Sequence, residues 1–246
     1  ELRACGFHLN LAPVLDVDTN PANPVIGDRA FAREADDVTR LAAAYAEGLG
    51  QAGVAACGKH FPGHGDTHLD SHTDLPVVEH DRDRLQRVEL APFASLASRL
   101  PAIMSAHVVF PAWDPDRPAT LSPVLMQGLL RAKIGFEGVV FSDDMEMKAV
   151  ADRHPPEALA VASVEAGVDV ISNCHDPARQ ERTLSALVQR SQEDPGFWAK
   201  VEAAAARVAQ LKARWIDPQA RPDPARAERV AREEAHHRLA AGLAEG

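Results

Sequence analysis

At residues 53–72 the chain reads GVAACGKHFPGHGDTHLDSH, an apolar run followed by a lysine, four histidines and two aspartates. Pro62, Gly63 and Gly65 exclude a helix through the polar part, because proline removes a backbone donor and glycine disfavours helix. We therefore predict a buried strand over Val54–His60 and a polar loop after it. In a barrel of alternating strands and helices, the strand ends and the loops that follow them carry the chemistry.

Comparable apolar runs alternate with helical patterns along most of the chain. The predicted strands are Phe7–Val17, Val54–His60, Ala102–Phe110, Gly138–Ser142 and Val168–Ser172, and the predicted helices are Asp36–Ala52, Asp81–Ser98, Ser122–Ile134, Glu157–Gly167, Asp176–Ser191 and Pro195–Trp215. Apolar strands that alternate with helices indicate an α/β fold with a parallel sheet. These strands are fewer than a closed barrel needs, and an open doubly wound sheet is an alternative, although no G-x-G-x-x-G follows the first strand.

The composition limits the class of protein. With 246 residues and 46% hydrophobic content, the chain can bury the core of one ordinary α/β domain. Its net charge of −10 argues against nucleic-acid binding, which requires a basic surface. No apolar run has the length of a membrane span, and no signal peptide is visible. Cys5, Cys57 and Cys174 are odd in number and far apart, which favours free thiols in a reducing compartment over a disulfide.

The two ends of the chain differ from its middle. Residue 1 is Glu rather than Met, and residues 1–6 resemble the last turn of a helix closed by glycine, so we expect an upstream segment. After residue 216 come several prolines and then an Arg/Glu/Ala-rich stretch. We divide the chain into a catalytic domain over residues 1–216 and a proline-containing linker with a C-terminal helix over residues 217–246.

The histidine-rich loop allows two kinds of chemistry. His60, His64 and His68 are spaced by four, which on a helix would suggest a metal face; loops also bind metals, so a metal site stays an alternative. Asp70 lies two residues before His72, and a carboxylate beside an imidazole fixes its tautomer and raises its basicity. The alternative for this pair is a solvated polar loop.

Other strand ends carry further polar residues. Asp143 and Asp144 end an apolar strand, where a carboxylate points into the mouth of a barrel; Asp144 is alternatively the cap of the next helix. Arg29 follows the first strand, and its guanidinium suits sugar hydroxyls and carboxylates, although a lone loop arginine is usually exposed. Lys59 and His60 can donate hydrogen bonds in the same region, with Asp16 as structural support.

Taken in order, these motifs resemble glycoside hydrolase family 3, and within it the β-N-acetylglucosaminidases of bacterial cell-wall recycling. The resemblance runs from about Gly6 to about Cys174. Its anchors are Ala12-Pro-Val-Leu-Asp16, Ile26-Gly-Asp-Arg29, Gly58-Lys-His-Phe-Pro-Gly-His-Gly-Asp66, Asp70-Ser-His72, Ser105-Ala-His107, Gly135-Phe-Glu-Gly138 and Ser142-Asp-Asp-Met145. The β-glucosidases of the family share a Lys-His pair but lack the Pro-Gly-His-Gly and Asp-Ser-His elements.

The resemblance implies a (β/α)8 TIM-barrel-like catalytic domain, here without the first two βα units of the family. It implies a retaining enzyme that removes non-reducing terminal GlcNAc from peptidoglycan fragments such as GlcNAc–anhydro-MurNAc muropeptides. Carried over by position, Asp143 is the nucleophile and His72, held by Asp70, is the general acid/base. The residues that bind GlcNAc are Arg29, Lys59 and His60. No metal or organic cofactor is expected, and the loop around His72 is expected to close over substrate.

Three alternatives remain at this level. The first is another exo-acting member of the family, a β-glucosidase or a glycoside phosphorylase, and a neutral histidine as acid/base would let phosphate approach as acceptor. The second is a metal-dependent hydrolase that uses the histidine cluster. The third is an inactive sugar-binding fragment. We expect a cytoplasmic monomer that acts on small saccharides and has no nucleic-acid or membrane partner.

Overall fold

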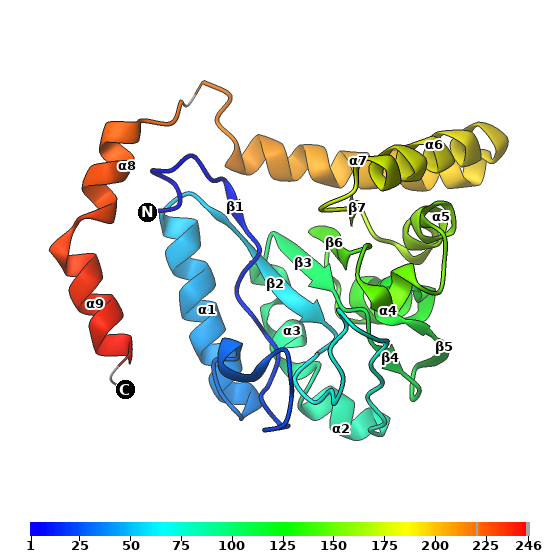
Figure 1. The fold of residues 1–246 in the computed structure, drawn as a ribbon, viewed down its shortest axis with the longest axis horizontal. Helices are drawn as coiled ribbons and strands as arrows, with labels where there is room; N and C mark the ends of the chain where they lie inside the picture. Colours follow the sequence, from blue (N-terminus) through cyan, green and yellow to red (C-terminus); the bar gives the residue numbers. More distant parts are fainter. Residues whose placement is uncertain (220, 245–246) are drawn as a thin grey trace.

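The computed structural model describes residues 1–219 and 221–244 of the chain. Its centre is a curled parallel sheet with the strand order β1-β2-β3-β6-β7 (Figure 1). The strands are β1 (Leu9–Asn10), β2 (Ala55–Phe61), β3 (Ala102–Ser105), β6 (Val139–Asp144) and β7 (Val170–Ser172). Successive strands along the chain are neighbours in the sheet, as right-handed crossovers through helices produce. The predicted α/β fold with a partial barrel is confirmed.

The connections between strands are mostly helical and cover the sheet. They are α1 (Ala35–Gln51), α2 (Arg82–Arg87), α3 (Ala91–Leu96), the π-helix η4 (Val124–Lys133), α4 (Lys148–Ala151), α5 (Pro156–Ala166), α6 (Pro177–Glu193) and α7 (Pro195–Trp215). The main core lies between β2, β3 and these helices. There the rings of Phe61 in β2 and Phe93 in α3 meet edge to face at 5.4 Å, both fully buried. Such aromatic burial contributes several kcal/mol to the stability of a core, of which about 1 kcal/mol comes from the ring contact itself.

The first strand is shorter than predicted. We expected a strand over Phe7–Val17, but β1 contains only Leu9 and Asn10. Pro13 interrupts the ladder because it has no N–H to donate. The chain nevertheless continues beside β2, since the Leu15 N–H donates to the Lys59 carbonyl at 2.6 Å. The end of this segment is therefore held at the carboxyl end of β2, where Asp16 follows.

Two other predicted elements are divided in the structure. The helix expected over Asp81–Ser98 is split into α2 and α3, and Pro92 lies in the first turn of α3, where its missing N–H costs nothing. The strand expected over Ala102–Phe110 ends at Ser105. Its second half forms β4 (Val109–Phe110), which pairs with β5 (Asp114–Pro118) in a separate antiparallel hairpin.

The boundary between α6 and α7 follows local rules. The Asp194 carboxylate accepts hydrogen bonds from the backbone N–H groups of Gly196 and Phe197, and Pro195 occupies the first helical position. Both features are typical of helix starts. A cap of this kind contributes about 1 kcal/mol to helix stability, and it fixes the reversal that lays α7 against α6 (Figure 1).

Beyond Trp215 the structure has two helices where we predicted one, α8 (Pro224–Ala231) and α9 (Glu234–Ala244). They lie beside α1 and the start of the chain (Figure 1), where the His236 Nδ1 atom is 3.0 Å from the Glu1 carboxylate. Among the described residues, no helix is both long and apolar enough to cross a bilayer. The three cysteines are free thiols; Cys5 and Cys174 are exposed, whereas Cys57 in β2 is buried and burial raises its pKa to about 12.

Candidate active site

The polar residues singled out by sequence gather at the carboxyl ends of β2 and β6. Lys59 and His60 are the fifth and sixth residues of β2, and Asp143 is the fifth of β6. The carboxyl ends of parallel strands meet at one edge of a sheet, so these side chains share one end of the partial barrel. The charges of Lys59 and Asp143 act on each other, which places both groups in one site.

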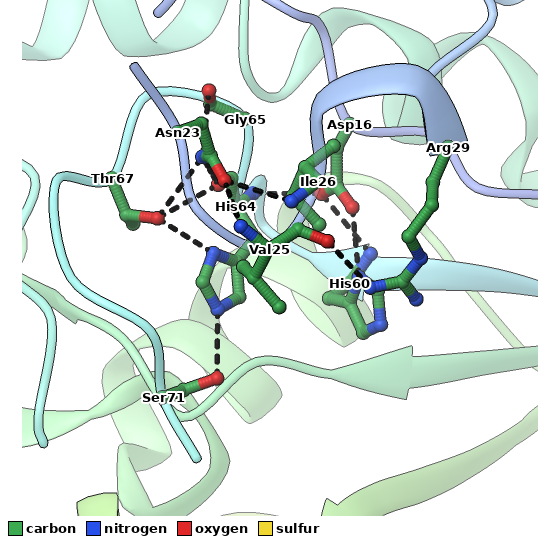
Figure 2. Close-up of polar contacts among 10 residues, drawn as sticks. All are labelled: Asp16, Asn23, Val25, Ile26, Arg29, His60, His64, Gly65, Thr67 and Ser71. Atoms are coloured by element: carbon green, nitrogen blue, oxygen red, sulfur yellow. Dashed lines mark hydrogen bonds and ion pairs between the residues drawn. The ribbon is translucent and has the colours of Figure 1, made fainter. Parts of the chain in front are cut away.

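Asp16 organises the side of the site nearest β2. Its carboxylate is completely buried and accepts a hydrogen bond from His60 Nδ1 at 2.7 Å (Figure 2). It also accepts the backbone N–H groups of His60 at 3.2 Å and His64 at 2.7 Å. Burial alone would raise the pKa of Asp16, but the charge and hydrogen bond of His60 outweigh it and lower the pKa. The ionised carboxylate keeps the His60 proton on Nδ1 and leaves Nε2 to face a substrate.

Arg29 reaches the same place from a short 3-10 helix, η1 (Gly27–Arg29). Its Nη1 group donates to the Val25 carbonyl at 2.9 Å (Figure 2). Burial and the neighbouring Arg29 charge lower the pKa of Lys59, while Asp143 opposes this shift. The structure therefore brings Lys59 and His60, two of the residues predicted to bind sugar, close to the Asp143 carboxylate, and it places the exposed third residue, Arg29, near Lys59. Two cations and an imidazole donor match the hydroxyl and amide oxygens of an amino sugar.

Asp143 is half-buried at the end of β6. Burial acts to raise the pKa of its carboxyl group, but His60 and His107 together lower it, and the Asp144 backbone N–H donates to Asp143 Oδ1 at 2.9 Å. Lys59 adds to this stabilisation of the anion. The carboxylate is thus ionised at neutral pH and free to attack an electrophilic carbon, as a glycosidase nucleophile requires.

Asp144 has a different environment from Asp143. Its Oδ1 atom accepts the N–H groups of Glu146 at 3.1 Å and Cys174 at 3.3 Å. Through these hydrogen bonds Asp144 links the segments that follow β6 and β7. The N-cap position of α4 is occupied by Met147, so the alternative of Asp144 as a helix cap is wrong.

The predicted dyad of Asp70 and His72 is formed. His72 Nδ1 lies 2.7 Å from Asp70 Oδ1, and the same oxygen accepts the His72 backbone N–H at 2.9 Å. Burial acts to raise the pKa of Asp70, but the two hydrogen bonds from His72 outweigh burial and lower it. The carboxylate therefore holds a proton on Nδ1 and leaves Nε2 to exchange protons with substrate. The His72 side chain is 61% exposed, and within the described residues no hydrogen bond joins the dyad to Asp143.

The predicted alternative of a three-histidine metal site is not supported. His60 is bonded to Asp16, both ring nitrogens of His64 are bonded to hydroxyl groups, and His68 Nδ1 lies 3.1 Å from the Asn20 amide. These rings therefore face separate partners rather than a shared centre. A different group, Asp144, Glu146 and His175, has donor atoms within 4.8 Å of one another. Its two carboxylates accept backbone N–H groups of residues 174–176 and so brace the start of α6.

Sequence reasoning did not assign a role to His107, which is buried after β3. Its Nε2 atom lies 3.1 Å from the Asp144 carbonyl and its Nδ1 atom 2.9 Å from the Thr120 hydroxyl. Burial lowers the pKa of His107, so the neutral ring donates from Nε2 to that carbonyl. This bond fixes the backbone directly after Asp143. The signal in the sequence was the position of His107 inside the strand predicted over Ala102–Phe110, because a polar ring in a buried segment needs partners.

Comparisons with known proteins identify the family of the chain. Residues 1–211 match the family model described as the glycosyl hydrolase family 3 N terminal domain. The chain is 37% identical over 263 aligned positions to "Beta-hexosaminidase A" of Pseudoalteromonas piscicida, and the match covers 99% of the chain and 44% of that relative. The chain thus spans about half the length of the curated relatives it matches.

Solved structures give the same result. The family 3 β-N-acetylglucosaminidase from Paenibacillus sp. str. FPU-7 superposes with a TM-score of 0.86 at 43% identity, covering 91% of this chain and 43% of that one. A more distant structure, the β-glucoside phosphorylase BglX bound to 2FGlc, gives a TM-score of 0.80 at 26% identity, covering 87% of this chain and 40% of that one.

Proposed function

The chain belongs to glycoside hydrolase family 3, and from this membership we propose that it is a retaining exo-β-N-acetylglucosaminidase. The observation that carries the proposal is the environment of Asp143, an ionised carboxylate among Lys59, His60 and His107 at the carboxyl end of the sheet. Relatives named β-hexosaminidase and a solved β-N-acetylglucosaminidase support the choice of an N-acetylated sugar.

In the proposed mechanism Asp143 attacks the anomeric carbon and forms a glycosyl-enzyme. The His72 imidazolium gives the proton on Nε2 to the departing oxygen, and Asp70 stabilises the charged ring through Nδ1. In the second step neutral His72 takes a proton from water, and the water oxygen attacks the anomeric carbon on the opposite side from Asp143. The bond between this carbon and Asp143 breaks, and the carboxylate is released. Two displacements at one carbon retain its configuration. Arg29, Lys59 and His60 hold the sugar during both steps.

The proposed natural substrates are GlcNAc-terminated peptidoglycan fragments such as GlcNAc–anhydro-MurNAc muropeptides. The enzyme is proposed to act on them in the cytoplasm as a monomer. The residues 1–216 are the proposed catalytic domain. Support for the location comes from the three free thiols, which suit a reducing compartment. A mixture of muropeptides separated by mass would test the substrate, since the enzyme should shorten each GlcNAc-terminated species by one GlcNAc residue.

The first test compares 4-nitrophenyl β-GlcNAc with 4-nitrophenyl β-glucoside. The chain should hydrolyse the N-acetylated substrate in preference, and Asp143→Ala should lower kcat by roughly three orders of magnitude or more. Asp116→Ala is a matched control, because Asp116 is an exposed aspartate of β5, in the hairpin that is separate from the parallel sheet. If Asp143→Ala retained wild-type kcat, the nucleophile assignment would be wrong.

The second candidate is a glycoside phosphorylase, which the likeness to BglX favours. A neutral histidine carries no charge that would repel phosphate from the glycosyl-enzyme. Adding phosphate should then produce GlcNAc 1-phosphate at the expense of free GlcNAc. A product ratio unaffected by phosphate excludes this candidate.

A further inference from the structure

His64 is a buried histidine that has no assigned role in the proposed reaction. Only 2% of its surface is exposed, and both ring nitrogens have hydrogen-bond partners inside the protein. Nδ1 lies 2.9 Å from the Thr67 hydroxyl and Nε2 lies 2.9 Å from the Ser71 hydroxyl. Figure 2 shows the ring between these two groups, spanning the inside of the histidine-rich loop.

The surrounding hydrogen bonds determine which nitrogen carries the proton. The Thr67 hydroxyl donates its only hydrogen to the His64 carbonyl at 3.1 Å, so it accepts from the ring. Nδ1 is therefore the protonated nitrogen and Nε2 the acceptor, and the Ser71 hydroxyl donates to Nε2. Burial, opposed by Asp16, lowers the pKa of His64 to about 4, which keeps this tautomer neutral at physiological pH.

Each end of this contact is anchored to a different part of the active site. The His64 backbone N–H donates to Asp16, the same carboxylate that orients His60. The Ser71 carbonyl accepts the N–H of Ala149 in α4, 3.2 Å away and six residues after Asp143. Ser71 is thus tied through its side chain to His64, whose backbone is bonded to Asp16, and through its own backbone to the segment that follows Asp143.

Ser71 is also the residue between the two members of the dyad. Asp70 and His72 are partly or largely exposed, whereas only 2% of Ser71 is exposed. The contacts of Ser71 therefore fix the part of the loop from which both dyad side chains project. A displacement of about 1 Å in a catalytic group can cost about 100-fold in rate.

We propose that His64 and Ser71 are positioning residues that hold the Asp70–His72 dyad in register with Asp143, an inference that rests on the proposed glycosidase function. The pair acts on proton transfer and does not touch the sugar. Its loss should therefore weaken the steps that need His72 and spare binding in the sugar subsite.

The test uses Ser71→Ala and His64→Asn with two β-GlcNAc substrates that differ only in the leaving group. The methoxy group of methyl β-GlcNAc must be protonated as it leaves, whereas the dinitrophenolate group of the dinitrophenyl glycoside leaves without a proton. We expect kcat/KM for the methyl glycoside to fall roughly 10- to 100-fold, and kcat/KM for the dinitrophenyl glycoside to change by less than about threefold. With the dinitrophenyl substrate kcat should still fall, because the second step needs His72 as base.

Three controls separate positioning from general damage. His64→Gln can place its amide oxygen near the Nε2 position and accept from Ser71, so it should recover most of the lost kcat/KM, unlike the shorter His64→Asn. Ser163→Ala removes another fully buried serine, one bonded to Leu159 within α5, and should match wild type on both substrates. Active-site titration corrects for unfolded protein, which would lower the apparent kcat/KM for both substrates by the same factor.

Hydrogen exchange of the loop amides gives a readout independent of turnover. Ser71→Ala should speed exchange at Thr73, Asp74 and Ala149, whose N–H groups are bonded within or to the loop, and Ser163→Ala should not. Unchanged exchange, or equal losses on both substrates, overturns the positioning role while leaving the glycosidase proposal intact. If wild type and Asp143→Ala were both inactive, the glycosidase proposal would fail and the exchange result alone would decide the role of the pair in the loop.

Discussion

Asp16 has no contact with solvent and accepts three hydrogen bonds, two of them from His60. An isolated buried carboxylate would be costly, and two backbone N–H groups together with the His60 ring offset that cost. The sequence indicated a supporting role for Asp16 from its place after a strand. It did not indicate that the same carboxylate also fixes His64, because that contact depends on how the loop folds back after Phe61.

Asp16→Asn tests this arrangement by replacing one carboxylate oxygen with an amide nitrogen. The amide keeps one acceptor oxygen but offers an N–H where His60 Nδ1 must donate. We expect a loss of about 2 kcal/mol in the free energy of unfolding and roughly a tenfold rise in KM, with a smaller change in kcat. Urea denaturation and steady-state kinetics measure the two effects, and Asp116→Asn is the exposed control. A KM equal to that of wild type would show that His60 keeps its orientation without Asp16.

The pH dependence of stability follows from His64. The pKa of this histidine is about 4 in the folded chain, whereas an unperturbed histidine, as in the unfolded chain, has a pKa of 6.5. Between these two pH values the unfolded chain therefore binds more protons than the folded chain. Stability should be fully present above about pH 6.5 and should fall as the pH decreases to about 4, by about 3 kcal/mol. Urea titrations at several pH values should show a shallower decline for His64→Gln. Identical slopes for both proteins would contradict the neutrality assigned to His64.

At the scale of elements, the sequence predicted the alternation of strands and helices and most helix positions. α1, α5 and α7 begin and end within one or two residues of the expected ranges. It failed where a tertiary contact overrides a local pattern. The apolar run after Ser105 continues as strand-like sequence, but it leaves the sheet and pairs with β5 instead. No periodicity within the run distinguishes the two partners.

The candidate site was predictable to a similar extent. From motif order we predicted Asp70, His72, Asp143 and the residues proposed to bind sugar, because each lies at or after a strand end. His64 and Ser71 were quoted within motifs but had no separate signal, since their importance arises from a contact across the loop. Such contacts depend on turn geometry, which a pattern of residue types does not specify.

Two glycines with opposite surroundings test the packing of the loop. A Cβ atom at Gly65 would lie 1.8 Å from the Val17 carbonyl oxygen, whereas one at Gly48 in α1 meets nothing within 4 Å. We expect Gly65→Ala to cost several kcal/mol or to prevent folding, because the backbone of two segments would have to separate. Gly48→Ala should instead stabilise the chain by about 0.5–1 kcal/mol. Thermal unfolding of both variants checks the pair, and a Gly65→Ala melting temperature near wild type would contradict the close approach.

At the scale of the whole molecule, the sheet is open at both edges. β1 and β7 are the edge strands, and they have only two and three residues. Short edges limit unwanted pairing with other chains. The site lies at the end of the sheet formed by the longer strands β2 and β6, while α8 and α9 lie on the outer side of α1 (Figure 1).

Removing residues 217–246 tests the proposed catalytic domain. α9 lies against α1 and the start of the chain through contacts such as His236 with Glu1, away from Asp143. We expect the chain of residues 1–216 to keep kcat/KM within about twofold and to lose no more than about 2 kcal/mol of stability, as for loss of a small surface contact. A large fall in kcat/KM with the fold retained would show that the C-terminal helices belong to the catalytic unit.

The burial of Cys57 makes the rate at which its thiol is labelled a measure of how often the central sheet opens. Its thiol lies in β2, two residues before Lys59, and its pKa of about 12 leaves almost no reactive thiolate at neutral pH. A thiol reagent will therefore modify Cys5 and Cys174 at the surface first and reach Cys57 only when the central sheet opens. The delay between these labelling events times the opening of β2, the strand that carries Lys59 and His60, without any introduced cysteine.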